Sequence, residues 1–156
     1  MRGWTSSSPF LGALAALVIL LVLVFIVGSV VGRTLPVAHV ASRSAELAVP
    51  PEQVWDVIND PAFMRSRGVG DVKTEMVESV PPRRLVRRIV GETDFGGTWT
   101  SELDAEPGGG TRLLITENGE IYNAFFRFVS RYVVGHHRTI DSFIAALRRH
   151  LEARGG

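Results

Sequence analysis

His136 and His137 are adjacent in the sequence, and histidine is a common metal ligand. On a helix, neighbouring side chains point about 100° apart, so the two imidazoles cannot face one ion together. His137 and Asp141 do share a face at i, i+4, but two ligands are fewer than a metal site needs. The chain has no cysteine, which excludes thiol ligands and thiol catalysis. We therefore predict no metal and no cofactor, and interpret the histidines as a polar patch beside Gly135.

Four side chains could act as a general acid or base: Glu102, Glu117, Glu120 and Tyr122. General acid–base catalysis needs such a group within hydrogen-bond reach of the substrate. Alternation along a strand puts Trp99 and Leu103 on one face and Glu102 on the other. We interpret the glutamate side as the solvated face, and we assign a catalytic role to none of these four side chains.

The stretch RRLVRR carries four arginines: Arg83, Arg84, Arg87 and Arg88. On a strand they divide between both faces, so they do not form one phosphate-binding stripe. Contact with anionic lipid headgroups remains an alternative, but the alternation favours a solvated hairpin. The glycines of EPGGGT (106–111) permit the positive φ angles of a hairpin turn. No helix follows them, as a phosphate loop would require.

An apolar run without any charge, FLGALAALVILLVLVFIVGSVV, extends from Phe10 to Val31. It spans roughly 33 Å as a helix, which is enough to cross a bilayer core of about 30 Å. A signal peptide has a shorter apolar region of about 7–15 residues, and a core helix would carry a polar face. We predict an N-terminal tail over residues 1–9, a single-pass transmembrane helix over 10–32 and a linker over 33–38.

The net charge of the residues after the apolar run indicates whether this part of the chain binds nucleic acid. All 16 acidic residues and every basic residue except Arg2 follow the apolar run, so this part is nearly neutral. A nucleic-acid-binding domain normally shows a basic excess on one face, so we expect no nucleic acid. The positive-inside rule does not orient the span, because Arg2 and the amino terminus oppose Arg33 and Arg43.

Hydrophobic periodicity predicts the elements that would position these groups. HVASRSAELAV (39–49) alternates as a strand does, and Pro51 then starts a short helix with Val54, Trp55 and Ile58 on one face. Asp60 and Pro61 end that helix. Four strand-like runs follow, over 71–79, 83–91, 95–106 and 110–122, and their short links predict an antiparallel meander. From Ala124 to about Ala153 the period becomes helical, with a kink at Gly135.

Three of these stretches, with the closing helix, resemble the START-like superfamily, also described as SRPBCC or polyketide cyclase/dehydrase-like. They are AVPPEQVWDVINDPAFM (48–64), VPPRRLVRRIV (80–90) and FGGTWTSELDAEPGGGTRLLITENGEIYN (95–123). The resemblance implies an α+β helix-grip domain over residues 39–153, with a C-terminal tail over 154–156. Members usually have two more strands after the short helices. Only SRGVG (66–70) fills that interval here, so we predict a curved sheet of about five strands instead of seven, with a smaller or more open cavity.

The apolar run predicts a membrane tether, and the resemblance implies a cavity between the sheet and the C-terminal helix. Together they predict a membrane-tethered module that binds an apolar small molecule or lipid in that cavity. Eight apolar or aromatic side chains are the predicted cavity lining: Val54, Trp55, Ile58, Trp99, Leu113, Phe128, Tyr132 and Phe143. A cyclase/dehydrase-type enzyme and an interaction domain without a cavity are the alternatives. Inward-facing ionisable groups would favour the enzyme. The resemblance also favours the cytoplasmic side for the domain.

Overall fold

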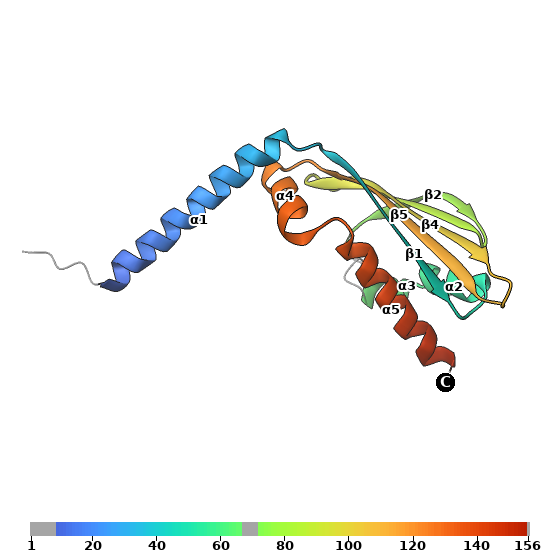
Figure 1. Cartoon of the computed structure of the whole chain (residues 1–156). Coiled ribbons are helices and arrows are strands. Elements are labelled where there is room, and N and C mark those ends of the chain that lie inside the picture. Colours follow the sequence, from blue (N-terminus) through green and yellow to red (C-terminus); the bar gives the residue numbers. More distant parts are fainter. Residues whose placement is uncertain (1–8, 67–71, 156) are drawn as a thin grey trace, which may run out of the picture.

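The computed structural model describes residues 9–66 and 72–155, and Figure 1 shows a long helix projecting from a domain of sheet and helices. The projecting helix is α1 (Pro9–Thr34). The sheet has five strands: β1 (Ala38–Leu47), β2 (Thr74–Val80), β3 (Arg84–Ile89), β4 (Phe95–Ala105) and β5 (Thr111–Ile121). Their order is β1-β5-β4-β3-β2 and all neighbours are antiparallel, which confirms the α+β class and the five-stranded sheet. The turn after β4 has Gly109 at φ +84°, a left-handed conformation that glycine adopts without strain.

Helices connect and cover the sheet: α2 (Pro51–Asn59), α3 (Pro61–Ser66), α4 (Ala124–Val129), the π-helical η1 (Ser130–Val134) and α5 (Arg138–Gly155). The helical stretch predicted from Ala124 is divided and not merely kinked. Gly135 has φ +80°, and its N–H bonds to the Ser130 carbonyl, which closes η1. That φ is incompatible with a continuing helix. The axis of α5 therefore does not continue the axis of α4 (Figure 1).

The hydrophobic core lies between one face of the sheet and α5, with α2 and α3 at the side. Leu103, Leu113 and Ile115 of the sheet are fully buried, as are Ile140 and Leu147 of α5. From α2, Val54, Val57 and Ile58 are buried in the same cluster. Trp55, predicted to share one apolar face with Val54 and Ile58, is half-buried and packs at the edge of this core. The aliphatic side chains of α2 therefore supply most of its contacts with the core. A helix shorter than about 12 residues needs such tertiary contacts, because it is marginally stable alone.

Helix α1 is long and apolar enough to cross a membrane, judged by its length and composition. Its C-terminal turns, from Phe25 to Gly32, pack against α4. Gly32 abuts the backbone of Ala124, and a side chain at Gly28 would meet the rings of Phe125 and Phe128 at 3.0 Å. Arg127 Nε donates a hydrogen bond of 2.9 Å to the Gly32 carbonyl. Small residues allow this close approach of two helices.

Candidate functional site

The alternation of side chains along β5 places the Glu117 carboxyl on the inner face of the sheet. Leu113, Ile115 and Glu117 stand at steps of two, so all three side chains point toward α5. Glu117 pairs across the ladder with Trp99 of β4 and Ala41 of β1. The expectation that the glutamates lie on the solvated face is therefore wrong for Glu117.

Glu117 lies in a mostly apolar environment with little hydrogen bonding. Its Oε1 atom is 3.6 Å from Nε2 of His39. Its Oε2 atom is buried and has no hydrogen-bond partner among the residues that the structure describes. Burial raises the pKa of the Glu117 carboxyl, because the charged form loses solvation without gaining hydrogen bonds. This carboxyl is consequently the group on the inner face that is best suited to carry or donate a proton.

Two histidine rings lie beside Glu117. His39, on β1, stands opposite Gly119 of β5, where any side chain would collide with the His39 ring. Its ring stacks on His136 with 4.1 Å between centroids, and His136 Nδ1 lies 3.1 Å from Ser130 Oγ. Burial, and next the charge of His136, lower the pKa of His39; burial also lowers the pKa of His136, helped by Arg131 and His137. Both rings are therefore kept neutral over a wider pH range than a free histidine.

Glu117 lines a cavity of about 320 Å³ between the sheet and the start of α5. The walls are mainly apolar, and their larger side chains are Met64, Ile89, Phe95, Trp99 and Phe143. Trp99 and Phe143 contact each other with 5.4 Å between ring centroids. The two ionisable side chains in the described lining are Glu117 and Arg87. Small-molecule sites usually have this composition, an apolar cavity with a small number of polar groups.

Arg87 is a second inward-facing group that the solvated-hairpin interpretation missed. It pairs with Trp99 in the ladder and therefore shares the inner face. Its Nη2 atom donates to the Asn59 side chain at 3.0 Å and to the Ile58 carbonyl at 3.3 Å, at the end of α2. Burial lowers the pKa of Arg87. Within the described residues, the Arg87 guanidinium thus donates hydrogen bonds to neutral oxygens.

A second cavity of about 330 Å³ adjoins the first. Both are lined by Glu117, Gly119, Phe95 and Thr139, so the carboxyl lies where they meet. The second cavity continues past the two histidines to side chains of α4 and η1, namely Phe126, Val129, Ser130 and Val134. Together the cavities lead from the sheet interior toward the helices beside α1.

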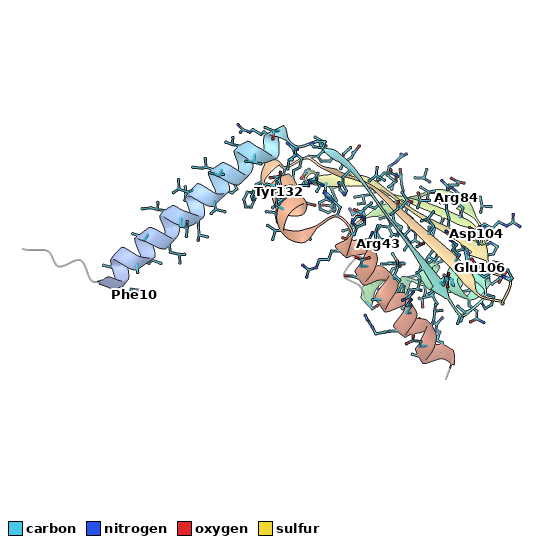
Figure 2. All side chains as sticks on the ribbon, in the orientation of Figure 1. Phe10, Arg43, Arg84, Asp104, Glu106 and Tyr132 are labelled. Carbon is cyan, nitrogen blue, oxygen red and sulfur yellow. The ribbon has the colours of Figure 1, made fainter. Side chains whose placement is uncertain are left out.

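The other groups considered as chemical candidates lie on the outer surface. Arg84 pairs with Glu102 and, at 3.1 Å, with Glu78, and Figure 2 shows Arg84 at the end of the sheet remote from α1. Arg88 pairs with Glu75 at 3.3 Å. Tyr122 donates to Glu120 at 2.7 Å, and both are exposed. Asp141 pairs with Arg43 at 3.0 Å. Among residues 9–66 and 72–155, no group of three or more histidine, aspartate or glutamate side chains is arranged to hold a metal ion.

The predicted lining residues fall into three places. Trp99 and Phe143 line the first cavity. Val54, Ile58 and Leu113 belong to the packed core, and Trp55 packs at its edge, because α2 fills the space next to α5. Phe128 lies against α1, and Tyr132 is exposed, because the break at Gly135 turns their segment away from the sheet. The role of these side chains in ligand binding stays a prediction.

The functional side chains that sequence reasoning missed had a weak signal. Glu117 continues the two-residue spacing of Leu113 and Ile115, but Leu114 is also apolar and obscures the alternation. Nothing local connects His39 with His136, which are brought together only by the fold.

Comparison with known proteins agrees with this architecture. The chain matches no protein-family model and no curated protein. It is similar to the structure of a conserved protein from Geobacillus kaustophilus, with a TM-score of 0.61, 16% identity, and coverage of 74% of this chain and 96% of that one. Protein MLL2253 from Mesorhizobium loti gives a TM-score of 0.59 at 16% identity, covering 74% and 98%. CalU16 from Micromonospora echinospora gives 0.51 at 19%, covering 78% and 85%. These likenesses show the fold alone, which is the helix-grip arrangement of an antiparallel sheet packed on a long C-terminal helix.

Replacing Glu117 by Gln is expected to stabilise the domain at neutral pH. The folded-state pKa is raised above the ordinary value, so the wild-type protein loses stability as pH rises through the interval between the two pKa values. The gain of the variant should vanish below the ordinary value of 4.5, where the carboxyl is protonated in both states. Unfolding curves of both proteins from pH 4 to pH 8 measure this difference. Glu92→Gln, at an exposed position, is the control, and a Glu117→Gln gain no larger than that of the control would contradict the prediction.

Proposed function

We propose that this chain is a membrane-anchored helix-grip protein that binds an apolar small molecule or lipid between the sheet and α5. The observation that carries the proposal is the cavity of about 320 Å³ with aromatic and aliphatic walls. Its size lies near the lower end of the roughly 300–1,000 Å³ range of small-molecule sites. The adjoining second cavity supplies room for a longer ligand.

The polar groups of the cavity indicate which end of a ligand would be recognised. Arg87 presents a cation that donates hydrogen bonds to a backbone carbonyl and to an amide oxygen. Glu117, with its raised pKa, would present a proton donor when neutral. Both groups complement an acceptor oxygen, so a fatty acid or an aromatic polyketide fits better than a cationic molecule.

The anchor gives the cavity its supply of ligand. Side chains of α1 are exposed along the span from Phe10 to Val27, which is costly in water and favourable in hydrocarbon. A domain held at the bilayer surface meets apolar ligands at high local concentration.

Filling the mouth of the cavity is expected to weaken ligand binding. Thr139 is exposed in the first turn of α5 and lines both cavities. Thr139→Trp should reduce the affinity for palmitic acid at least about ten-fold, which corresponds to roughly 1.4 kcal/mol. Native mass spectrometry of the full chain, released from detergent after incubation with palmitic acid, measures the occupied fraction.

Ala145→Trp is the matched control, since Ala145 is exposed on the same helix and is absent from the lining of both cavities. The control should bind as the wild type does. If palmitic acid occupied the same fraction of the wild type, Thr139→Trp and Ala145→Trp, its binding site would lie outside these two cavities. A wild-type chain that is folded and binds neither palmitic acid nor a panel of aromatic polyketides would support the interaction domain instead.

The inward orientation of Glu117 and His39 favours a second candidate, an enzyme of the cyclase/dehydrase kind. A carboxyl with a raised pKa beside a neutral imidazole can transfer a proton to or from a bound substrate. Incubation with a linear polyketide, followed by product analysis, distinguishes the two functions. Conversion that disappears in Glu117→Gln would identify an enzyme, whereas a ligand recovered unchanged supports binding.

A further inference from the structure

The segment formed by α4 and η1 (residues 124–134, the α4–η1 segment) exposes large apolar side chains. Phe126 is 48% exposed, Tyr132 61%, Val133 71% and Val134 45%. Its sequence, AFFRFVSRYVV, includes two arginines and no acidic residue. Contiguous apolar exposure next to basic residues is typical of helices that lie in a membrane interface.

This segment runs alongside the final turns of α1. The rings of Phe25 and Phe125 lie 4.9 Å apart, and Phe128 packs over Gly28. Tyr132 adjoins Phe128, with 5.3 Å between ring centroids. Figure 2 accordingly shows Tyr132 on the side of the segment next to α1. The apolar surface of the segment is therefore continuous with that of α1.

The contact also sets the depth of the segment. Phe25 precedes Gly32 by seven residues, which is about 10 Å along a helix. The uncharged run from Phe10 to Gly32 is roughly 34 Å long, slightly longer than a hydrocarbon core of about 30 Å, so Phe25 lies inside the core in any register that fills it. Phe125, in contact with Phe25, must then enter the hydrocarbon as well.

From these contacts we infer that the α4–η1 segment is a second membrane element, inserted into the leaflet that holds the C-terminal end of α1. The inference rests on the proposed anchoring of α1. Arg33 and Arg131 are exposed, and Arg131 lines a hollow with Leu35 and Pro36, just beyond the end of α1, where anionic headgroups would lie. Tyr132 suits the aromatic belt of the same interface.

The backbone of the segment tolerates this position. Asn123 Oδ1 accepts hydrogen bonds from the N–H groups of Phe125 and Phe126, at 2.9 and 3.2 Å, which caps α4. The Gly135 N–H bonds to Ser130, and Arg127 bonds to the Ile121 and Tyr122 carbonyls at 3.0 and 2.9 Å. These bonds satisfy groups that would be costly to leave unpaired in hydrocarbon.

Insertion would place the second cavity at the membrane surface. Its lining includes Phe126, Val129 and Val134 of the inserted segment. The proposed ligand would then pass from the leaflet to Glu117 without crossing water. A bilayer-dissolved lipid is the class of ligand that this path suits.

Single nitroxide labels on the full chain in vesicles of phosphatidylcholine and phosphatidylglycerol test the inference. The chain contains no cysteine, so Val133→Cys, Val22→Cys and Val77→Cys each give one labelled site. Val22 is on α1, and Val77, 47% exposed on the edge strand β2, is the matched aqueous control. We expect Val133 and Val22 to collide with oxygen and to lose collisions with a water-soluble nickel complex, whereas Val77 keeps them.

The outcomes separate this inference from the proposed anchoring. Nickel collisions at Val133 with lipid exposure at Val22 would overturn the inserted segment and leave the anchor intact. Nickel collisions at both sites would overturn both. Protection of Val133 from both oxygen and nickel would indicate burial against a protein, and would also overturn insertion into lipid.

Discussion

Leu147→Ala is expected to lower the free energy of unfolding by about 2–5 kcal/mol, the range for removing a buried leucine side chain. Leu147 is 0% exposed and lies on the face of α5 that packs against the sheet and α2. The substitution leaves a cavity at the centre of the helix-grip core, which close-packed neighbours refill only in part. Denaturant unfolding of the full chain in detergent, followed by tryptophan fluorescence, measures the change.

Arg149→Ala, at an exposed position of the same helix, is the control and should change stability by less than about 0.5 kcal/mol. If both variants unfolded at the same denaturant concentration as the wild type, α5 would not be packed on the sheet in solution.

Gly32→Ala is expected to separate α1 from α4 and to cost about 1–3 kcal/mol, the usual range for overpacking. A Cβ atom at Gly32 would overlap the carbonyl oxygen of Ala124. Because the obstacle is backbone, no side-chain rotation relieves it, and the two helices must move apart. The hydrogen bond from Arg127 to the Gly32 carbonyl would lengthen as well.

Electron–electron distances between nitroxides at Val22 and Val133 measure this separation in the full chain. The distance should increase and broaden in Gly32→Ala. Gly12→Ala is the matched control, since a Cβ atom at Gly12 meets nothing within 4 Å, and its distance distribution should equal that of the wild type. Unchanged distances in both variants would show that the close crossing of α1 and α4 does not form in the full chain.

The elements of this protein could be predicted from the sequence because their causes are local. An uncharged run of apolar residues forms one long helix, and alternating polarity with glycine and proline turns forms a meander. The short interval after Ser66 predicted a sheet of five strands, which the structure confirms. The helical period after Ala124 was also visible. A kink at Gly135 was predicted, but the complete break there was not, because glycine permits a positive φ without requiring it.

The candidate site was decided by tertiary structure. Ladder register, which depends on pairing between distant segments, puts Glu117 opposite Trp99 and Ala41 and so turns it inward. The stacking of His39 on His136 brings together two residues that are far apart in the sequence. Arg87 became a cavity residue because β3 packs beside the end of α2.

The contact between α1 and α4 was likewise outside the reach of sequence patterns. Composition alone determined that α1 is apolar enough for a membrane and that the domain is nearly neutral. It did not determine that Gly28 and Gly32 receive α4, since a glycine pair in an apolar helix fits many partners. Local periodicity defines elements, whereas burial, pKa shifts and cavities depend on which elements meet, and only the folded chain decides that.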